Sequence, residues 1–139
     1  FEVRIELEAH AARLAAKRAT PSQIAEMEAL FADADDIIRR GDHRQLIHLD
    51  HQAHRLLAHA AQNEFLEEFL ERLYNHVLGL WYVSLHQVSR LREAIAEHRD
   101  IIAAVKAGDG ERAAQIMRAH IAGFQFEFAV ALNSGGNTS

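Results

Sequence analysis

The stretch EHRDIIAAVKAGDGERAAQIMRAHI, residues 97–121, decides the fold expected of this chain. It consists of two segments with apolar residues at helical spacing, separated by a glycine-rich turn around Asp109. Glycine ends helices, and an aspartate before the next segment can cap the helix that follows. We therefore predict two antiparallel helices. His98 lies eleven residues before Asp109 and His120 eleven residues after it, so the two imidazoles come level in such a hairpin.

Helical periodicity also runs through the rest of the chain, and no strand-like alternation persists. Thr20, Asp42 and Asn63 are typical N-caps. The predicted helices cover about residues 1–18, 21–40, 43–61, 64 onward, 88–107 and 110–132. The expected fold is all-α, an antiparallel bundle of about six helices with a central metal and ligand cavity. We expect one domain over 1–132 and a flexible polar tail over 133–139.

Composition excludes several classes of protein. A length of 139 residues with 49% hydrophobic side chains suits a single domain with one core. The absence of cysteine excludes a disulfide scaffold and thiolate metal sites, and favours a cytoplasmic location. A net charge of -5 argues against a broad basic surface for nucleic acid. No apolar run approaches the ~20 residues of a membrane span, so no membrane partner is expected.

Two further residues extend the histidine pair into a candidate metal site. Asp50 and His54 are four residues apart and share one face of their predicted helix. Together with His98 and His120 they offer three imidazoles and one carboxylate. Nitrogen and oxygen ligands suit Zn²⁺, Ni²⁺, Mn²⁺ or Fe²⁺ better than Ca²⁺ or Mg²⁺. An alternative stays open, because ten histidines produce such spacings by chance and a nearby carboxylate also satisfies a buried imidazole.

Four segments resemble the FCD domain, the C-terminal effector-binding domain of FadR-type regulators in the GntR family. They are Val3–Glu8, Leu49–His54, Glu97–Asp109 and Met117–Ile121. The likeness extends over about residues 1–130. Two departures are Ala53, where the family has an aromatic residue, and Glu64, where proline is common.

This resemblance implies a function. Asp50, His54, His98 and His120 would bind a divalent ion, with Zn²⁺ expected and Ni²⁺ or Mn²⁺ as alternatives. A small organic acid would bind beside the ion as the effector, paired with Arg4. The parent protein would be a homodimeric transcription regulator that binds DNA through a winged helix-turn-helix domain absent from this chain.

Three other positions bear on ligand and partner binding. Asn63 and Arg92 are predicted to line the mouth of the effector cavity, the alternative being a solvated helix face. The phenylalanines at 124, 126 and 128 cannot all face one core, so at least one is expected at the surface, where an apolar patch would suit a homodimer.

Two other functions remain open at this stage. One is a metal-dependent enzyme on a helical bundle. Against it, no general base is evident beside the site, since Glu97 adjoins His98 in sequence but is expected to point to another side of the helix. The other is a helical interaction module in which the histidines are incidental. It predicts protein without bound metal.

Overall fold

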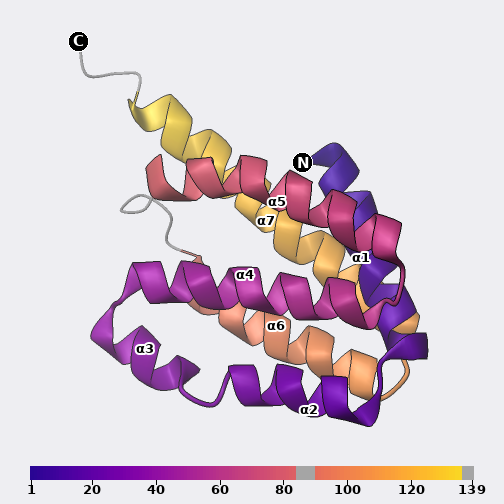
Figure 1. The fold of residues 1–139 in the computed structure, drawn as a ribbon. Coiled ribbons are helices and arrows are strands. Elements are labelled where there is room, and N and C mark those ends of the chain that lie inside the picture. Colours follow the sequence, from indigo (N-terminus) through magenta and orange to yellow (C-terminus); the bar gives the residue numbers. More distant parts are fainter. Residues whose placement is uncertain (84–89, 136–139) are drawn as a thin grey trace.

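The fold is a bundle of antiparallel helices, described by a computed structural model over residues 1–83 and 90–135 (Figure 1). The helices of these residues are α1 (Glu2–Arg18), α2 (Pro21–Leu30), α3 (Ala34–Arg40), α4 (His43–Ala60), α5 (Glu64–Val83), α6 (Leu91–Lys106) and α7 (Gly110–Gly135). The described residues form no β-strand. The all-α prediction is confirmed. α7 ends three residues beyond the predicted boundary at 132.

One predicted helix is wrong in detail, because the segment 21–40 forms two helices. Between α2 and α3 the backbone forms a turn with a hydrogen bond three residues back, in which the N–H of Ala34 donates to the carbonyl oxygen of Phe31 at 3.2 Å. The Arg99 guanidinium donates to the same carbonyl oxygen at 3.1 Å. The side chain of Phe31 is buried. Tertiary contacts therefore end α2 at a place where the sequence has no glycine or proline.

The predicted N-caps and the glycines that end helices are confirmed, while the helix start predicted at residue 88 and the tail residues 136–139 lie outside the described residues. The side chains of Thr20, Asp42, Asn63 and Asp109 each accept a hydrogen bond from a backbone N–H three residues on, all at 3.1 Å. Gly41 and Gly108 have φ angles of 67° and 73°, in the left-handed region where glycine carries no steric penalty. The turn at Gly108 joins α6 and α7 as an antiparallel hairpin.

The core lies where α1, α4, α6 and α7 meet. α7 packs along α1 and α6, and α4 contacts α1, α5 and α6 (Figure 1). Trp81 on α5 is buried against Phe124 and Phe128 on α7, with ring centroids 4.6 and 5.0 Å away. This arrangement places the middle of α4 opposite the middle of the α6–α7 hairpin.

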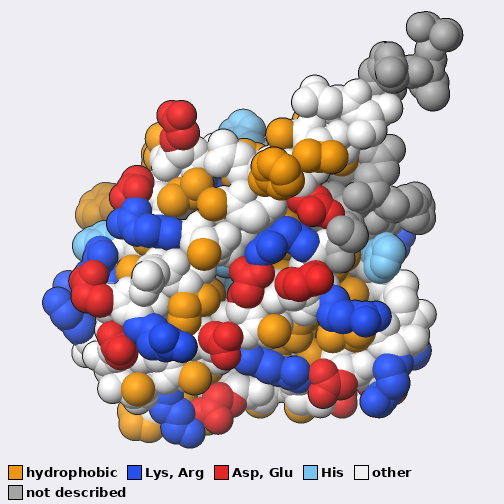
Figure 2. All heavy atoms as spheres, turned by 180° about the vertical axis from the view of Figure 1, so that it is seen from behind, with side chains coloured by type: hydrophobic (Ala, Val, Ile, Leu, Met, Phe, Trp, Pro, Cys, Tyr) orange, Lys and Arg blue, Asp and Glu red, His pale blue; other side chains and the backbone are white. Residues whose placement is uncertain are grey.

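The surface carries interspersed charges of both signs on the face shown in Figure 2. Phe126 is 71% exposed while Phe124 and Phe128 are buried, which confirms that one of the three faces outward. No helix among residues 1–83 and 90–135 is long and apolar enough to cross a membrane.

Candidate metal centre

The four predicted ligands meet in the core. Asp50 and His54 come from α4, His98 from α6 and His120 from α7. One ligand atom from each residue lies within 4.8 Å of the other three. All four side chains are buried. His98 and His120, which each lie eleven residues from Asp109, therefore come level in the hairpin, as predicted.

The imidazoles converge on one carboxylate oxygen. Nε2 of His98 lies 2.8 Å from Oδ1 of Asp50, and Nε2 of both His54 and His120 lies 3.5 Å from it. The Nε2 atoms of His54 and His120 are 3.3 Å apart. Tyr74 on α5 donates its hydroxyl hydrogen to Oδ2 of Asp50 at 3.0 Å. Asp50 is therefore the centre of the cluster.

These separations fit a divalent transition metal. Bonds of about 2.0–2.2 Å from such an ion to nitrogen and oxygen place neighbouring ligand atoms roughly 2.9–3.5 Å apart. The distances of 3.3 and 3.5 Å among His54, His120 and Asp50 fall in this range, while His98 stands closer to Asp50, at a hydrogen-bond distance of 2.8 Å. Two basic nitrogens at 3.3 Å also need a proton or a cation between them. Three nitrogens and one oxygen, buried and convergent, are a suitable donor set for Zn²⁺, Ni²⁺ or Mn²⁺.

Two carboxylates hold the outer nitrogens of the cluster. Nδ1 of His54 donates to Glu8 on α1, and Nδ1 of His120 donates to Glu97 on α6, each at 3.1 Å. Nδ1 of His98 is buried and has no hydrogen-bond partner within the described residues. Its ring instead stacks on Phe31, with centroids 6.0 Å apart.

The expectation for Glu97 was therefore wrong, and Glu8 was missed. Glu97 does lie beside the site, because a helix between two partners can present adjacent residues to both. Its carboxylate binds the outer nitrogen of His120 and not the metal-binding face. Glu8 lies four residues after Arg4 on α1, and that i,i+4 spacing was the signal in the sequence that could have found it.

Without a bound ion, His54 and His98 differ in protonation because their pKa values are shifted in opposite directions. Burial lowers the pKa of His54, but the carboxylates of Glu8 and Asp50 outweigh this effect and raise it to about 9. Burial, together with the positive charge of its imidazole neighbours, lowers the pKa of His98 to about 4. Although burial opposes it, the imidazoles hold the pKa of Asp50 well below its usual range. A charged His54 thus stands beside a neutral His98.

The predicted effector residues have different surroundings. Arg4 is buried on α1, with Nε 3.5 Å from Oε1 of Glu8 and its guanidinium over the ring of Tyr74. It therefore lies next to the cluster. Asn63 caps α5. Arg92 is exposed and lines a surface hollow with Asp35. An effector role for Asn63 and Arg92 stays a prediction.

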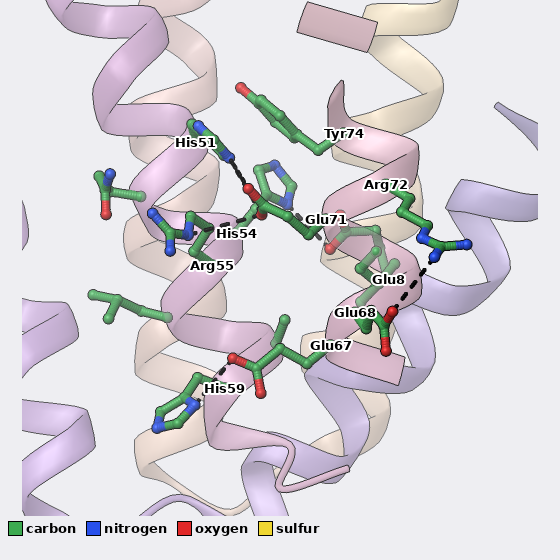
Figure 3. Close-up of a pocket in the computed structure, with 14 residues that line it drawn as sticks. Glu8, His51, His54, Arg55, His59, Glu67, Glu68, Glu71, Arg72 and Tyr74 are labelled. Atoms are coloured by element: carbon green, nitrogen blue, oxygen red, sulfur yellow. Dashed lines mark hydrogen bonds and ion pairs between the residues drawn. The ribbon is translucent and has the colours of Figure 1, made fainter. Parts of the chain in front are cut away.

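A hollow of about 480 Å³ between α4 and α5 reaches this region (Figure 3). Glu8, His54 and Tyr74 form part of its lining. Three contacts cross it between the helices: Nε2 of His51 lies 3.3 Å from Glu71, Nδ1 of His59 lies 3.1 Å from Glu67, and Arg55 forms an ion pair with Glu71 at 3.8 Å. The hollow connects the solvent with the outer side of His54.

Comparison with known proteins identifies the family. The FCD domain profile matches residues 1–123. The chain belongs to the FCD domain family. Its FCD sequence is 31% identical over 126 residues to the HTH-type transcriptional regulator McbR of Escherichia coli, covering 86% of the chain and 57% of McbR. The chain thus spans little more than half the length of this curated relative.

Solved structures agree with this assignment. The FCD fold resembles Streptococcus agalactiae GntR with a TM-score of 0.72 and 29% sequence identity, over 89% of this chain and 55% of that one. It resembles Escherichia coli McbR/YncC with a TM-score of 0.80, over 96% of this chain and 62% of that one. The second likeness, at 24% identity, shows the fold alone. The curated relative McbR carries the name of an HTH-type transcriptional regulator.

Proposed function

We propose that this FCD domain senses a small carboxylate through a divalent metal ion and controls the DNA-binding domain of a cytoplasmic, homodimeric GntR-family transcription regulator. The observation that carries the proposal is the buried convergence of three Nε2 atoms on Oδ1 of Asp50. In a helical interaction module with incidental histidines, the three imidazoles would not need to converge on one buried carboxylate. The proposal assigns no catalytic step to these residues.

The charges around the cluster favour an anionic ligand once an ion is bound. An ion binds only when the imidazoles are neutral, and the three carboxylates of Asp50, Glu8 and Glu97 then exceed the two guanidiniums of Arg4 and Arg90 by one negative charge. A divalent ion would supply two positive charges and open coordination positions, and so make the region positive. A carboxylate would then be attracted to it. Zn²⁺ is our proposed ion, with Ni²⁺ and Mn²⁺ as alternatives.

Arg4 is the proposed partner of the effector's carboxylate. Its Nε is buried and has no hydrogen-bond partner within the described residues. A buried guanidinium donor without an acceptor is costly, and a carboxylate provides two acceptors in the matching geometry. The ion pair with Glu8, at 3.5 Å, is longer than a hydrogen bond, so Arg4 can attract Glu8 and still have the N–H of Nε available to donate to an incoming carboxylate.

The test is thermal-shift screening of small mono-, di- and hydroxy-carboxylates against Zn²⁺-loaded and metal-free protein. We expect at least one acid to stabilise only the loaded protein, and Arg4→Met to weaken its binding about tenfold or more, as for other charge-assisted hydrogen bonds. Arg13→Met is the matched control, because Arg13 lies on α1 and pairs with the exposed Glu111. If acids bind equally well without the ion and to Arg4→Met, the proposal is wrong.

Metal binding is also expected to release a proton. Nε2 must be unprotonated to bind an ion, and the raised pKa of about 9 keeps His54 protonated below that pH when no ion is bound. Apparent affinity should therefore fall by up to about tenfold for each unit that the pH drops below about 9. Calorimetric Zn²⁺ titrations in buffers of different ionisation enthalpy count the proton. An affinity that does not change with pH would contradict this protonation.

A further inference from the structure

Two series of linked side chains of similar composition flank the metal cluster. The first relay is Arg4–Glu8–His54 and the second relay is Arg90–Glu97–His120. We propose that Glu8 and Glu97 are positioning residues that orient the imidazoles of His54 and His120 toward the ion, and that an arginine lying on an aromatic ring holds each carboxylate in place. The inference rests on the proposed metal-binding function. It concerns residues that do not themselves bind the ion.

The first relay runs from α1 to α4. Oε2 of Glu8 accepts from Nδ1 of His54 at 3.1 Å, and Oε1 lies 3.5 Å from Nε of Arg4. The guanidinium of Arg4 stands over the ring of Tyr74 at 5.2 Å from its centroid. The side chains of Glu8 and Arg4 are at most 5% exposed. A carboxylate fixed in this way makes Nδ1 the protonated nitrogen, so Nε2 presents its lone pair to the ion.

The second relay runs from α6 to α7 and repeats the pattern. Oε2 of Glu97 accepts from Nδ1 of His120 at 3.1 Å, while its Oε1 pairs with Arg90. The guanidinium of Arg90 lies 5.3 Å from the centroid of the Phe124 ring. This relay is less buried than the first, since the side chains of Arg90 and Glu97 are 23% and 22% exposed. It is therefore the one that can be altered with less risk to folding.

Gly123 makes room for the second relay. A Cβ atom built at this position would lie 2.4 Å from Cζ of Arg90 and 2.7 Å from its Nε. Any larger residue must therefore push the guanidinium aside. The atoms displaced are the far end of a flexible side chain, so the fold can absorb the change while Glu97 loses its anchor.

The third imidazole provides an internal contrast. Nδ1 of His98 has no hydrogen-bond partner within the described residues, and packing against Phe31 positions its ring. Two of the three imidazoles thus have a carboxylate behind them and one has none. Carboxylates behind ligating histidines raise ligand basicity and fix ring orientation, and their loss costs about 10–100-fold in metal affinity. A purely structural pair would affect stability and leave metal affinity unchanged.

The test is a titration of the metal-free protein with Co²⁺, followed by its visible absorption bands. Glu97→Gln keeps an acceptor for Nδ1 but removes the charge, and Gly123→Ala displaces Arg90 without touching a ligand. We expect Glu97→Gln and Glu8→Gln each to weaken Co²⁺ binding about 10–100-fold with altered bands. Gly123→Ala should weaken it by a smaller factor. Thermal melts of the metal-free variants check that they fold.

Two controls match these changes. Gly79→Ala is also a glycine-to-alanine change within a helix, and its Cβ would meet nothing within 4 Å. Glu111→Gln removes a surface carboxylate that pairs with an arginine. Both should bind Co²⁺ like the wild type. If Glu97→Gln and Glu8→Gln also do so, with unchanged bands, the relays do not position the ligands although the metal site stands. If the wild type binds no Co²⁺, the proposed function itself is wrong.

Discussion

Chelation of the bound ion is expected to lower the melting temperature by roughly 12–16 °C. An ion that binds only the folded state stabilises it by about 4 kcal/mol when its free concentration is a thousand times the dissociation constant. For a domain of this size each kcal/mol shifts the midpoint by roughly 3–4 °C. The effect should be large because the ligands come from α4, α6 and α7, which separate on unfolding.

Differential scanning calorimetry of Zn²⁺-loaded and EDTA-dialysed protein measures this shift. Readdition of Zn²⁺ should restore the higher midpoint. Mg²⁺ should not, because it prefers oxygen ligands and retains its water shell. Equal midpoints before and after chelation would mean that the cluster is satisfied without an ion.

Replacing Asp50 with asparagine is expected to have the second large effect. Asp50→Asn keeps the size of the side chain but removes the charge on which the three Nε2 atoms converge. Zn²⁺ affinity should fall by more than about 100-fold, beyond the range of residues that only orient ligands. The metal-free protein should lose about 3 kcal/mol of unfolding free energy, because the charged His54 loses one of its two buried carboxylate partners.

Zn²⁺ titration and urea unfolding of the same variant separate the two effects. Asp35→Asn is the matched control, since Asp35 is an exposed aspartate that pairs with Arg99. It should change stability by less than about 1 kcal/mol and leave Zn²⁺ affinity unchanged. An Asp50→Asn variant that still binds Zn²⁺ tightly would place the ion elsewhere.

The sequence was sufficient to predict the parts of the fold that depend on local signals. The N-caps and the glycines that end helices lie where their chemistry is specific, so the elements around them were predicted correctly. The α6–α7 hairpin followed from one turn. Once that turn was placed, the equal offsets of His98 and His120 brought them level opposite Asp50.

What the sequence did not predict depends on tertiary contacts. The end of α2 has no breaking residue and results from contacts of Phe31 with the rest of the bundle. Glu8 is one of twenty acidic residues, and only the packing of α1 against α4 singles it out. Glu97 was misplaced because adjacent helical residues diverge by about 100°. That divergence lets Glu97 reach His120 on α7 while His98 reaches Asp50 on α4.

Elemental analysis of the untagged, freshly purified protein tests metal dependence most directly. Our account predicts about one divalent transition ion per chain, since the cluster offers a single set of four ligand atoms. No stoichiometric metal, even after incubation with excess Zn²⁺ or Ni²⁺ and removal of the unbound ion, would contradict it and leave the buried histidines with a structural role.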